Sequence, residues 1–368
     1  MNLLVCASEY YPHGSGIANV AHHVVERLRD RGVACTICSP TGPEVAVGSG
    51  RLIRDIAVGG LLHYWHGVSR LRTAGDYDAL WLHNPLFPGR SPFPNAVATI
   101  HSTYLNKCRQ GMAPAPYYRM AAALERRSLA RTAAVGAGFT AVSETVRTDL
   151  EAIGIDRSAI ALVPNGVDTS CFSPAADRRA LRREWGIPED RTVVLFLGRV
   201  AEAKRPVRLV EVFARIREAA PDALLVIAGG GEQLERTRER ARALGLGDAV
   251  RFLGPVAYDR VPDLYRLADC YIMASRSEGS PLSLLEALSS GLPAIVSAIP
   301  PLTFVGDEGL GLVVDFDAPD AAAGIADFLG RDLRRQGERA RTFVTLHHDW
   351  AVIADRYLAL FEAAAEAR

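Results

Sequence analysis

The sequence predicts an α/β protein with two Rossmann-like domains, because short apolar strands alternate with amphipathic helical segments along its 368 residues. Such alternation is typical of parallel sheets covered by helices on both faces. The chain is also longer than the roughly 250–300 residues at which single hydrophobic cores stop growing, so two domains are expected. Hydrophobic residues make up 49% of the chain and charged residues 23%, the composition of an ordinary folded protein.

The first half of the chain is expected to form one sheet. A strand over residues 2–6 precedes a glycine-rich turn at 14–16, which opens an amphipathic helix to about Arg31. Further strands are predicted over residues 33–38, 79–82, 96–100, 141–142 and 160–163. Asn165-Gly166 then predicts a turn, and we interpret residues 169–190, with their clustered charges, as an interdomain linker.

The second half repeats the alternation. Strands are predicted over residues 192–197, 223–228, 250–253, 270–273, 294–297 and 312–314, with helices between them. The segment from Trp350 to Ala365 has apolar residues at helical spacing and no strand after it. It is therefore expected to be a final helix.

The segment from Ser277 to Leu288 is the most informative about function. It is predicted to be a loop entering a helix, with Ser280 as the N-cap and Pro281 in the first helical position. A helix start offers unpaired backbone N–H groups and the positive end of the helix dipole, so it suits a phosphate. Glu278 and Glu286 flank this point, at a spacing suited to hydroxyl groups on either side of a bound diphosphate. A nucleotide sugar has that layout.

The use of lysine gives a second indication. The chain has 42 Lys and Arg residues, but only Lys107 and Lys204 are lysines, a bias that fits a GC-rich genome. Lys204 lies shortly after the apolar strand 192–197 and the pair Gly198-Arg199. A compact ammonium and a planar guanidinium differ as phosphate ligands, and a tight turn can favour the ammonium. A solvated loop lysine is the alternative interpretation.

The order and spacing of several motifs closely resemble the retaining glycosyltransferases of glycosyltransferase family 4, and the resemblance covers nearly the whole chain. Triple glycines and Pro-Asn-Gly turns are common, so each motif is weak by itself and the set is strong. The motifs are Pro12-His13-Gly14-Ser15-Gly16, Thr99-Ile100-His101, Val163-Pro164-Asn165-Gly166-Val167-Asp168, Gly198-Arg199 with Lys204, Gly229-Gly230-Gly231, Phe252-Leu253-Gly254-Pro255-Val256, and Glu278 with Glu286 around Gly279-Ser280-Pro281.

The resemblance implies the GT-B fold, in which two Rossmann-like domains with parallel sheets face a central cleft. We therefore expect an N-terminal, acceptor-binding domain over residues 1–170 and a C-terminal, nucleotide-sugar-binding domain over residues 171–349. The final helix, residues 350–368, is expected to cross back to the first domain. Ligands of open parallel sheets bind at the carboxyl ends of the strands.

The resemblance also implies roles for residues of the second domain. Glu286 matches the glutamate that accepts hydrogen bonds from the donor ribose, and Glu278 matches the one that faces the donor sugar ring. Arg199 and Lys204 match the pair that neutralises the diphosphate. The backbone N–H groups of the segment from Ser280 to Leu282 complete the diphosphate site, and Pro281 within it has no N–H. The base is expected near Val256.

Two positions of the first domain are implied in the same way. His101 follows the predicted strand 96–100 and matches a histidine beside the reacting carbon of the donor sugar. Gly16 is expected to allow close backbone approach. The chain departs from many relatives at Ser102, where an acidic residue is frequent, and at Ser15-Gly16, where a double glycine is common. The first departure leaves the acceptor side of the site undefined.

The expected reaction is metal-independent transfer of a hexosyl unit from a UDP- or GDP-sugar, with retention of configuration and no cofactor. Breaking the anomeric bond leaves charge on the diphosphate, which cationic side chains and the helix start can stabilise. Front-side attack is implied, with the leaving phosphate helping to deprotonate the acceptor. Asp76-Tyr77-Asp78 and Asp315-Phe316-Asp317 have the D-x-D pattern of metal-dependent transferases, but neither falls among the segments assigned to the diphosphate.

Other classes of protein remain as alternatives. A phosphorylase of similar fold needs a lysine for pyridoxal phosphate, and the one lysine of the second domain is assigned to phosphate. A nucleotide-sugar 2-epimerase of GT-B fold leaves Lys204 and the spacing of the two glutamates unexplained. A non-catalytic sugar-nucleotide-binding protein would retain the same site without turnover.

Charge is distributed unevenly along a chain whose formal net charge is zero. Residues 51–131 contain 11 basic and four acidic residues, interleaved with aromatic and aliphatic pairs such as Tyr64-Trp65 and Tyr117-Tyr118. This pattern suits an anionic membrane surface, or a lipid-linked or phosphorylated acceptor. An arginine-rich surface without function is the alternative. No nucleic-acid partner is indicated by the net charge.

The chain is expected to be cytoplasmic. It has no run of about 18 apolar residues, the length that would indicate a membrane span. The N-terminal run over residues 2–7 is too short for a signal-peptide core and lacks a basic lead. Binding of residues 51–131 to lipid would place the protein at the inner face of the membrane.

Overall fold

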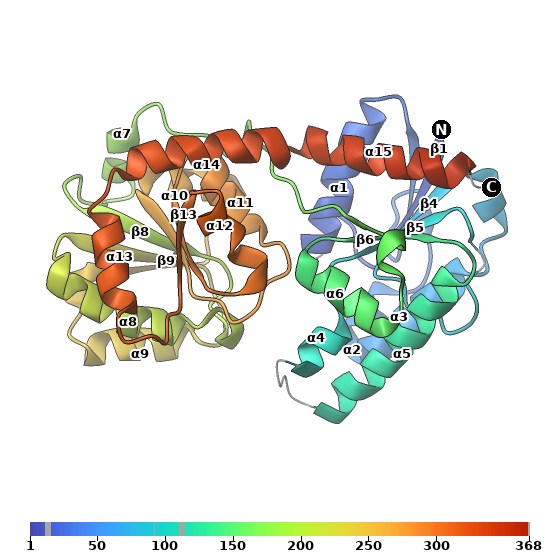
Figure 1. The fold of residues 1–368 in the computed structure, drawn as a ribbon, viewed down its shortest axis with the longest axis horizontal. Coiled ribbons are helices and arrows are strands. Elements are labelled where there is room, and N and C mark those ends of the chain that lie inside the picture. The colour runs from blue at the N-terminus through green and yellow to red at the C-terminus, as the bar shows by residue number, and fades with distance from the viewer. Residues whose placement is uncertain (12–15, 92, 110–114, 367–368) are drawn as a thin grey trace. The chain divides into compact units, whose positions relative to one another are not determined.

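A computed structural model of the chain describes residues 1–11, 16–91, 93–109 and 115–366. It divides into two compact units (Figure 1): unit 1 is Met1–Gly166 together with the chain from Trp350 onward, and unit 2 is Val167–Asp349. Most of the glycine-rich turn at 14–16 lies outside the described residues, and only Gly16 is within them.

The described part of unit 1 contains a seven-stranded sheet in which all neighbouring strands are parallel, in the order β3-β2-β1-β4-β5-β6-β7. Its strands are β1 (Asn2–Cys6), β2 (Ala34–Ser39), β3 (Val45–Ala46), β4 (Ala79–His83), β5 (Ala96–Ile100), β6 (Gly138–Ala141) and β7 (Ile160–Leu162). The sequence did not predict β3, which is only two residues long, and it placed β6 too late, at 141–142.

Helices cover both faces of this sheet. On one face lie α1 (Gly16–Arg29) and α15 (Trp350–Glu366), and Trp81 of β4 packs its ring 4.7 Å from that of Tyr357 in α15. On the other face, Leu80 and Leu82 share a core with α3 (Val58–Val68), α5 (Ala115–Ala133) and α6 (Glu144–Ile153). The alternation of side chains along β4 therefore serves two cores. The shorter α2 (Gly50–Ile56) and α4 (Tyr104–Arg109) complete the unit.

In unit 2, which is described throughout, six parallel strands follow the order β10-β9-β8-β11-β12-β13. They are β8 (Thr192–Leu197), β9 (Ala223–Ala228), β10 (Val250–Gly254), β11 (Cys270–Met273), β12 (Ala294–Ser297) and β13 (Gly311–Val314). Each predicted strand is present to within one residue at either end. This is the doubly wound order, in which the direction of strand addition reverses between the first and fourth strands, here β8 and β11.

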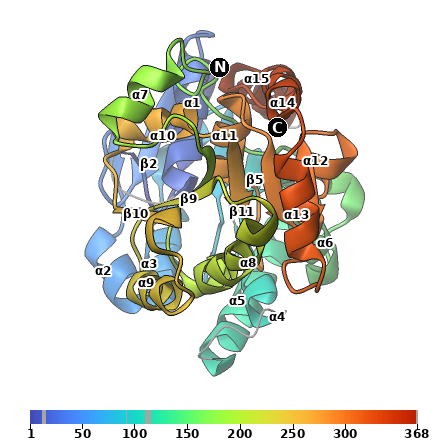
Figure 2. The same cartoon turned by 90° about the vertical axis from the view of Figure 1, so that its left-hand side faces the viewer.

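Figure 2 shows the sheet of unit 2 between two helical layers. One layer consists of α8 (Pro206–Ala219), α9 (Leu234–Ala243) and α13 (Ala321–Leu329), which share a core with Val194 and Phe196. The other consists of α10 (Val261–Leu267), α11 (Leu282–Ser289), α12 (Phe304–Asp307) and α14 (Leu333–His347), which share a core with Val193 and Leu195. Both faces of the sheet are therefore covered, which explains why its strands consist mostly of apolar residues.

Residues 169–190, interpreted from the sequence as a linker, belong to unit 2 and contain the helix α7 (Arg178–Glu184). Asp177 caps this helix by accepting a hydrogen bond from the backbone N–H of Ala180. Arg182 is buried and donates to the Leu267 carbonyl and to Asp269. The clustered charges of this segment thus anchor a helix on unit 2, and the linker interpretation was wrong.

The chain leaves and re-enters unit 1 at two adjacent points. Gly166 lies against the indole of Trp350, and a Cβ at position 166 would come within 2.4 Å of that ring, so only glycine fits here. Immediately beyond, within unit 2, the Val167 N–H donates to the His348 carbonyl at 2.8 Å. Among the described residues, no helix is both long enough and apolar enough to cross a bilayer.

Candidate functional site

The candidate site in unit 2 lies where the chain leaves the carboxyl ends of β8 and β11. These two strands are hydrogen-bonded neighbours at the point where the strand order reverses. The loops that follow them therefore lie side by side, and the Arg276 N–H donates to the Ala203 carbonyl at 2.9 Å. Such a switch point is where open parallel sheets bind ligands.

Lys204 and Glu278, which lie 74 residues apart in sequence, meet at this point. The Lys204 Nζ atom is 2.5 Å from Oε1 of Glu278, and the two side chains are 26% and 9% exposed. Lys204 ends the short 3₁₀ helix η3 (Glu202–Lys204), and Arg205 after it has a left-handed backbone with φ 52°. The ammonium is thus held in one place by a nearly buried carboxylate while part of it stays accessible. Removing either partner would leave the other charge uncompensated.

The triple glycine after β9 packs directly on the turn after β8. Gly229 has φ 130°, and a Cβ there would lie 1.9 Å from the Gly198 carbonyl oxygen. A Cβ on Gly231 would lie 2.4 Å from the Val200 carbonyl oxygen. The two glycines therefore permit a backbone approach that no other residue allows. Arg199, between these contacts, is exposed.

The start of α11 differs from its prediction by one residue. Pro281 is the N-cap, with φ −72° and ψ 118°, and the first helical residue is Leu282. Ser280, predicted as the N-cap, therefore lies outside the helix, because the proline adopts an extended conformation. The hydroxyl of Tyr271 in β11 bonds to Ser283 Oγ at 2.9 Å and to the Leu197 carbonyl at 3.3 Å. This contact fixes the first turn of α11 against the end of β8.

Glu286 lies on the face of α11 that packs against α10. The buried hydroxyl of Tyr265 donates a 2.8 Å hydrogen bond to Glu286 Oε2. Burial raises the pKa of Glu286 to about 7, although the Tyr265 hydrogen bond acts in the opposite direction. The carboxylate is thus close to titration at neutral pH. Tyr265 was not singled out from the sequence, because its apolar surroundings are those of any core residue.

The segment expected to hold the base follows β10. Val256 is partly buried and packs against the core beneath α10 and α11. Two residues later, Tyr258 exposes 60% of its side chain. An exposed aromatic ring beside Val256 is a surface on which a planar group could stack.

In unit 1, His101 follows β5, as predicted, and hydrogen-bonds to a second histidine. Its Nε2 lies 3.0 Å from Nδ1 of His83, the last residue of β4, and the two rings are stacked with centroids 5.3 Å apart. The backbone N–H of His101 donates to Asn84 Oδ1 at 2.9 Å. His83 and Asn84 were not singled out from the sequence. The available signal was a polar pair directly after an apolar strand, next to the strand that leads to His101.

Burial keeps both imidazoles neutral. The pKa of His101 is lowered to about 4 by burial, and that of His83 is lowered well below its usual range by burial and by the proximity of His101. Nε2 of His83 is buried and makes no hydrogen bond within the described chain. On the other side, His83 packs on Trp81, with ring centroids 4.2 Å apart. His83 is therefore set into the core of unit 1, whereas His101 next to it remains partly exposed.

Gly16, the remaining predicted residue of unit 1, is the first residue of α1.

In each of the two D-x-D sequences, an aspartate side chain binds nitrogen atoms of the protein. Asp78 Oδ2 accepts a 2.7 Å hydrogen bond from the Asn2 N–H, and Asp317 forms ion pairs with Arg205 and Arg208. No cluster of three or more His, Cys, Asp or Glu side chains with the geometry of a metal site occurs among the described residues.

Two family models match the sequence. The model described as Glycosyltransferase Family 4 matches residues 14–170, and the model described as Glycosyl transferases group 1 matches residues 177–343. Together they span most of the chain.

Curated relatives have similar sequences. Mannosylfructose-phosphate synthase of Agrobacterium fabrum is 33% identical over 231 residues, which cover 58% of this chain and 50% of that protein. D-inositol 3-phosphate glycosyltransferase of Geodermatophilus obscurus is 35% identical over 236 residues, covering 61% and 52%. The chain thus aligns with about half the length of these relatives. The protein of that name from Thermobifida fusca is 28% identical over 389 residues, covering 93% and 87%.

Solved structures share the fold. Sucrose-phosphate synthase of Thermosynechococcus elongatus superposes with a TM-score of 0.80 at 20% identity, covering 100% of both chains. WaaG, described as a glycosyltransferase involved in lipopolysaccharide biosynthesis, has a TM-score of 0.72 at 19% identity, covering 99% of both. Anabaena HepE in complex with UDP has a TM-score of 0.74 at 16% identity, covering 99% of this chain and 100% of that one. These likenesses show the GT-B fold of two parallel-sheet, Rossmann-like domains.

The neutral histidine pair predicts a particular acid sensitivity. Unfolded histidines take up protons near pH 6.5, whereas His101 in the folded protein does so only near pH 4, so the free energy of unfolding should fall as the pH drops through this window. Urea unfolding at pH 7, 6, 5 and 4 measures it. The double variant His83→Phe/His101→Phe should lose less stability over the same range. Parallel curves for the two proteins would contradict the prediction.

Proposed function

Because the chain belongs to glycosyltransferase family 4, we propose that it transfers a hexosyl unit from a nucleoside-diphosphate sugar to an acceptor hydroxyl. The observation that carries this proposal is the meeting of Lys204 and Glu278 at the switch point of the unit 2 sheet. One supplies positive charge for a diphosphate and the other a carboxylate for a sugar hydroxyl. The family resemblance alone would not have required the two side chains to touch.

In the proposed mechanism, unit 2 stabilises the leaving group. The bond between the anomeric carbon and the diphosphate oxygen breaks, and Lys204, Arg199 and the start of α11 stabilise the charge that develops on the diphosphate. Preorganisation favours Lys204 for this task, since Glu278 holds its ammonium before a ligand arrives. The acceptor oxygen bonds to the same face of the anomeric carbon, and its proton passes to the leaving phosphate. Retention and metal independence follow from this scheme.

We propose that Glu286 binds the donor ribose in its ionised form, which accepts hydrogen bonds from hydroxyl groups. Tyr265 holds the carboxylate through one oxygen, Oε2. We also propose that the base lies near Val256 and that His101 faces the reacting carbon of the donor sugar. His101 would act there as a neutral, oriented dipole, because its pKa of about 4 excludes an imidazolium at neutral pH.

The acceptor class is proposed from charge and from relatives. Two of the relatives are named for a phosphorylated substrate or product, an inositol phosphate and a mannosylfructose phosphate. Unit 1 of this chain carries the basic stretch 51–131, with a surplus of seven positive charges. A phosphorylated acceptor satisfies both observations, and a lipid-linked acceptor satisfies the second.

A donor screen in EDTA tests the proposed function. UDP- and GDP-hexoses, incubated with the protein and a panel of sugar phosphates, should give a glycoside whose anomeric configuration, read by NMR, is that of the donor. Slow hydrolysis of one donor without acceptor should identify the base. Activity that needs added magnesium or manganese would overturn metal independence. Donor binding with neither transfer nor hydrolysis would favour a binding protein, and an altered free nucleotide sugar would favour an epimerase.

The pKa of Glu286 predicts that donor affinity depends on pH. Below about pH 7 the carboxyl is protonated in the free protein, so each further pH unit should weaken nucleotide-sugar binding by up to about tenfold. Calorimetric titration between pH 8 and pH 5.5 measures this. Glu286→Gln should bind roughly tenfold or more weakly at pH 8 and show little change with pH. Pronounced pH dependence in the Gln variant would assign the titration to another group.

Lys204→Arg should lower kcat even though it conserves charge. The Lys204 ammonium is 2.5 Å from a carboxylate that is 9% exposed, and a longer, planar guanidinium has to displace Glu278 or the phosphate. Arg205→Lys is a matched control, since it makes a conservative change one residue away at a side chain that pairs with Asp317 instead. Steady-state kinetics with the cognate donor decide the matter. Wild-type kcat in Lys204→Arg would show that Lys204 does not bind phosphate.

The structure shows which residues of the basic stretch 51–131 are exposed and could contact a membrane. Tyr64 and Trp65, which the sequence shows interleaved with the basic residues, lie in the core of unit 1. Among the described residues of this stretch, the exposed large apolar residues are instead Ile56 of α2 and Met120 of α5, which are 58% and 52% exposed. Exposed arginines lie on the same two helices: Arg51, Arg54, Arg119, Arg126, Arg127 and Arg131. Binding of this surface to a membrane would therefore be mainly electrostatic.

We propose reversible adsorption of this surface to anionic lipid at the cytoplasmic face. Each arginine near an anionic surface contributes about 1 kcal/mol, and salt screens the attraction. Co-sedimentation with vesicles of anionic and of neutral lipid, at low and high salt, should show binding only to the anionic vesicles at low salt. Arg126→Glu/Arg127→Glu should abolish it. Protein that stays in the supernatant under all conditions would leave a soluble, phosphorylated acceptor.

A further inference from the structure

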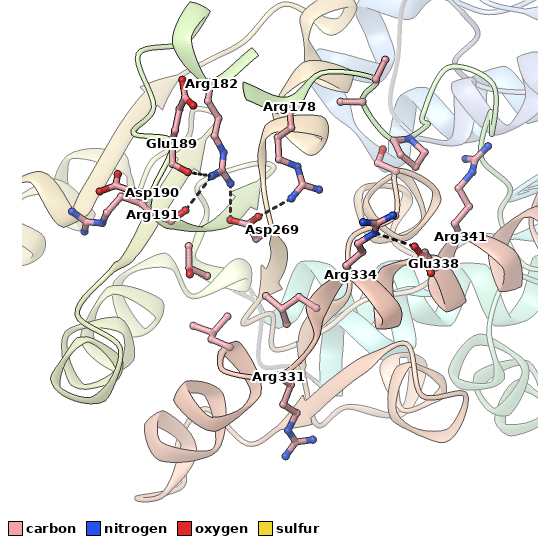
Figure 3. Close-up of a pocket in the computed structure, with 18 of the residues that line it drawn as sticks. Arg178, Arg182, Glu189, Asp190, Arg191, Asp269, Arg331, Arg334, Glu338 and Arg341 are labelled. Carbon is pink, nitrogen blue, oxygen red and sulfur yellow. Dashed lines mark hydrogen bonds and ion pairs between the residues drawn. The ribbon is translucent and has the colours of Figure 1, made fainter. Parts of the chain in front are cut away.

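Unit 2 has a cavity at the amino ends of its strands (Figure 3). Lys204 and Glu278 lie beyond the carboxyl ends, on the opposite side of the sheet's strands. The cavity has a volume of about 980 Å³ and is lined by Thr192, which begins β8, and by Asp269, which precedes β11. The candidate donor residues follow the carboxyl ends of these same strands. The six residues of β8 span on the order of 15–20 Å, so the cavity and the candidate donor site are separate.

Arginine dominates the charged lining of this cavity. Six arginines and four carboxylates line it, which leaves two positive charges in excess. The arginines are Arg178, Arg182, Arg191, Arg331, Arg334 and Arg341, and the acidic residues are Glu189, Asp190, Asp269 and Glu338.

The carboxylates neutralise only part of this charge. Asp269 is shared between Arg178 and Arg182, at 2.7 and 2.6 Å. The carboxylate of Glu189 is bound by Arg183, a residue that does not line the cavity. One lining acid therefore serves two arginines and another is engaged elsewhere, whereas Arg331 is paired with Asp327, which does not line the cavity.

Two of the arginines form no ion pair at all within unit 2. Arg341 donates to the carbonyls of Thr169, Phe172 and Ser289, and Arg191 donates to those of Asp222 and Ala223. Burial lowers the pKa of Arg341, although the charge of Asp349 acts in the opposite direction.

Helix capping accounts for some of these side chains. Leu267 and Ser289 end α10 and α11, and their carbonyls accept hydrogen bonds from Arg182 and Arg341. A cation at the carboxyl end of a helix stabilises it. Capping does not account for Arg178 of α7 and Arg334 of α14, which also line the cavity and which Figure 3 shows directed at Asp269 and Glu338.

Arg334 is free to change partner. Its side chain is 90% exposed, and its ion pair is with Glu338 one turn along the same helix. An exposed pair of this kind contributes little to stability, so a ligand anion could recruit the guanidinium.

Ser290 supplies a polar group without a partner. It is 2% exposed and lines the cavity, and its hydroxyl makes no hydrogen bond within unit 2. A buried hydroxyl that lacks a partner costs free energy, which a ligand oxygen would recover.

We propose that this cavity is a second ligand site, which binds a phosphorylated small molecule through its phosphoryl group. The volume is that of a small-molecule pocket. Arginine side chains suit the phosphoryl oxygens, which they can bind through two parallel hydrogen bonds. Arg178 and Arg334 bind the phosphoryl group, and Ser290 donates to one of its oxygens. This site is independent of the proposed transferase activity.

Calorimetric titration with inorganic phosphate in 0.15 M chloride tests the proposal. Arg334→Glu should weaken phosphate binding about tenfold or more, because it reverses the charge of a direct ligand. The matched control is Arg335→Glu, which makes the same change of charge at the next residue, also exposed and outside the cavity lining. Its phosphate affinity should stay within about twofold of wild type, because salt screens more distant charges.

The comparison of the two variants decides the outcome. Equal weakening in both would mean diffuse attraction to a basic surface, and no weakening in either would mean that phosphate binds only elsewhere, as at Lys204. Either result overturns the proposal. Donor affinity, measured separately with a nucleotide sugar, should be unchanged in Arg334→Glu, so failure of the proposed transferase function would be recognised independently. Ser290→Ala should weaken phosphate binding several-fold without altering the net charge.

Discussion

The adjacency of β8 and β11 in unit 2 is the constraint on which the candidate donor site depends. Because every pair of neighbours in this sheet is parallel, both strands end at the same edge, and the residues that follow them must share one space. Lys204 and Glu278 form their ion pair there. The glycines after β9 let a third loop approach the same point without a side chain between the backbones. The strand order thus brings together two side chains that no local sequence motif could place next to each other.

A single physical cause, burial, shifts the pKa of a candidate residue in each unit. It raises the pKa of Glu286 to about 7 and lowers that of His101 to about 4, because a low dielectric disfavours a charge of either sign. The two groups consequently differ in what they can do at neutral pH. Glu286 can respond to small changes in pH or to a ligand, whereas His101 remains neutral and is held by His83.

The sequence was most informative where one local pattern determines structure. Apolar runs located the strands of unit 2 to within one residue, whereas β3, with two residues, has no pattern to detect. Residues 169–190 were mistaken for a linker because their clustered charges were taken to indicate a solvent-exposed segment. Arg182 is in fact buried, and its side chain bonds to carbonyl groups and to Asp269. The His83–His101 contact depends on which strands are neighbours. Tertiary pairing of this kind cannot be read from spacing along the chain.

The helix α11 begins near the carboxyl ends of the unit 2 strands and ends near their amino ends. It carries Glu286 near its middle, and the Ser290 N–H just past its end donates to the Glu286 carbonyl at 3.0 Å. Ser290 lines the arginine-rich cavity, so the backbone of one short helix joins the candidate ribose carboxylate to the second site. Contact alone does not make the sites communicate. A ligand in the cavity changes donor affinity only if it binds two arrangements of α11 unequally, and any such effect is reciprocal. The eight residues of α11, anchored at one end by Tyr271 and at the other by Arg341, are therefore where coupling between the sites would have to occur.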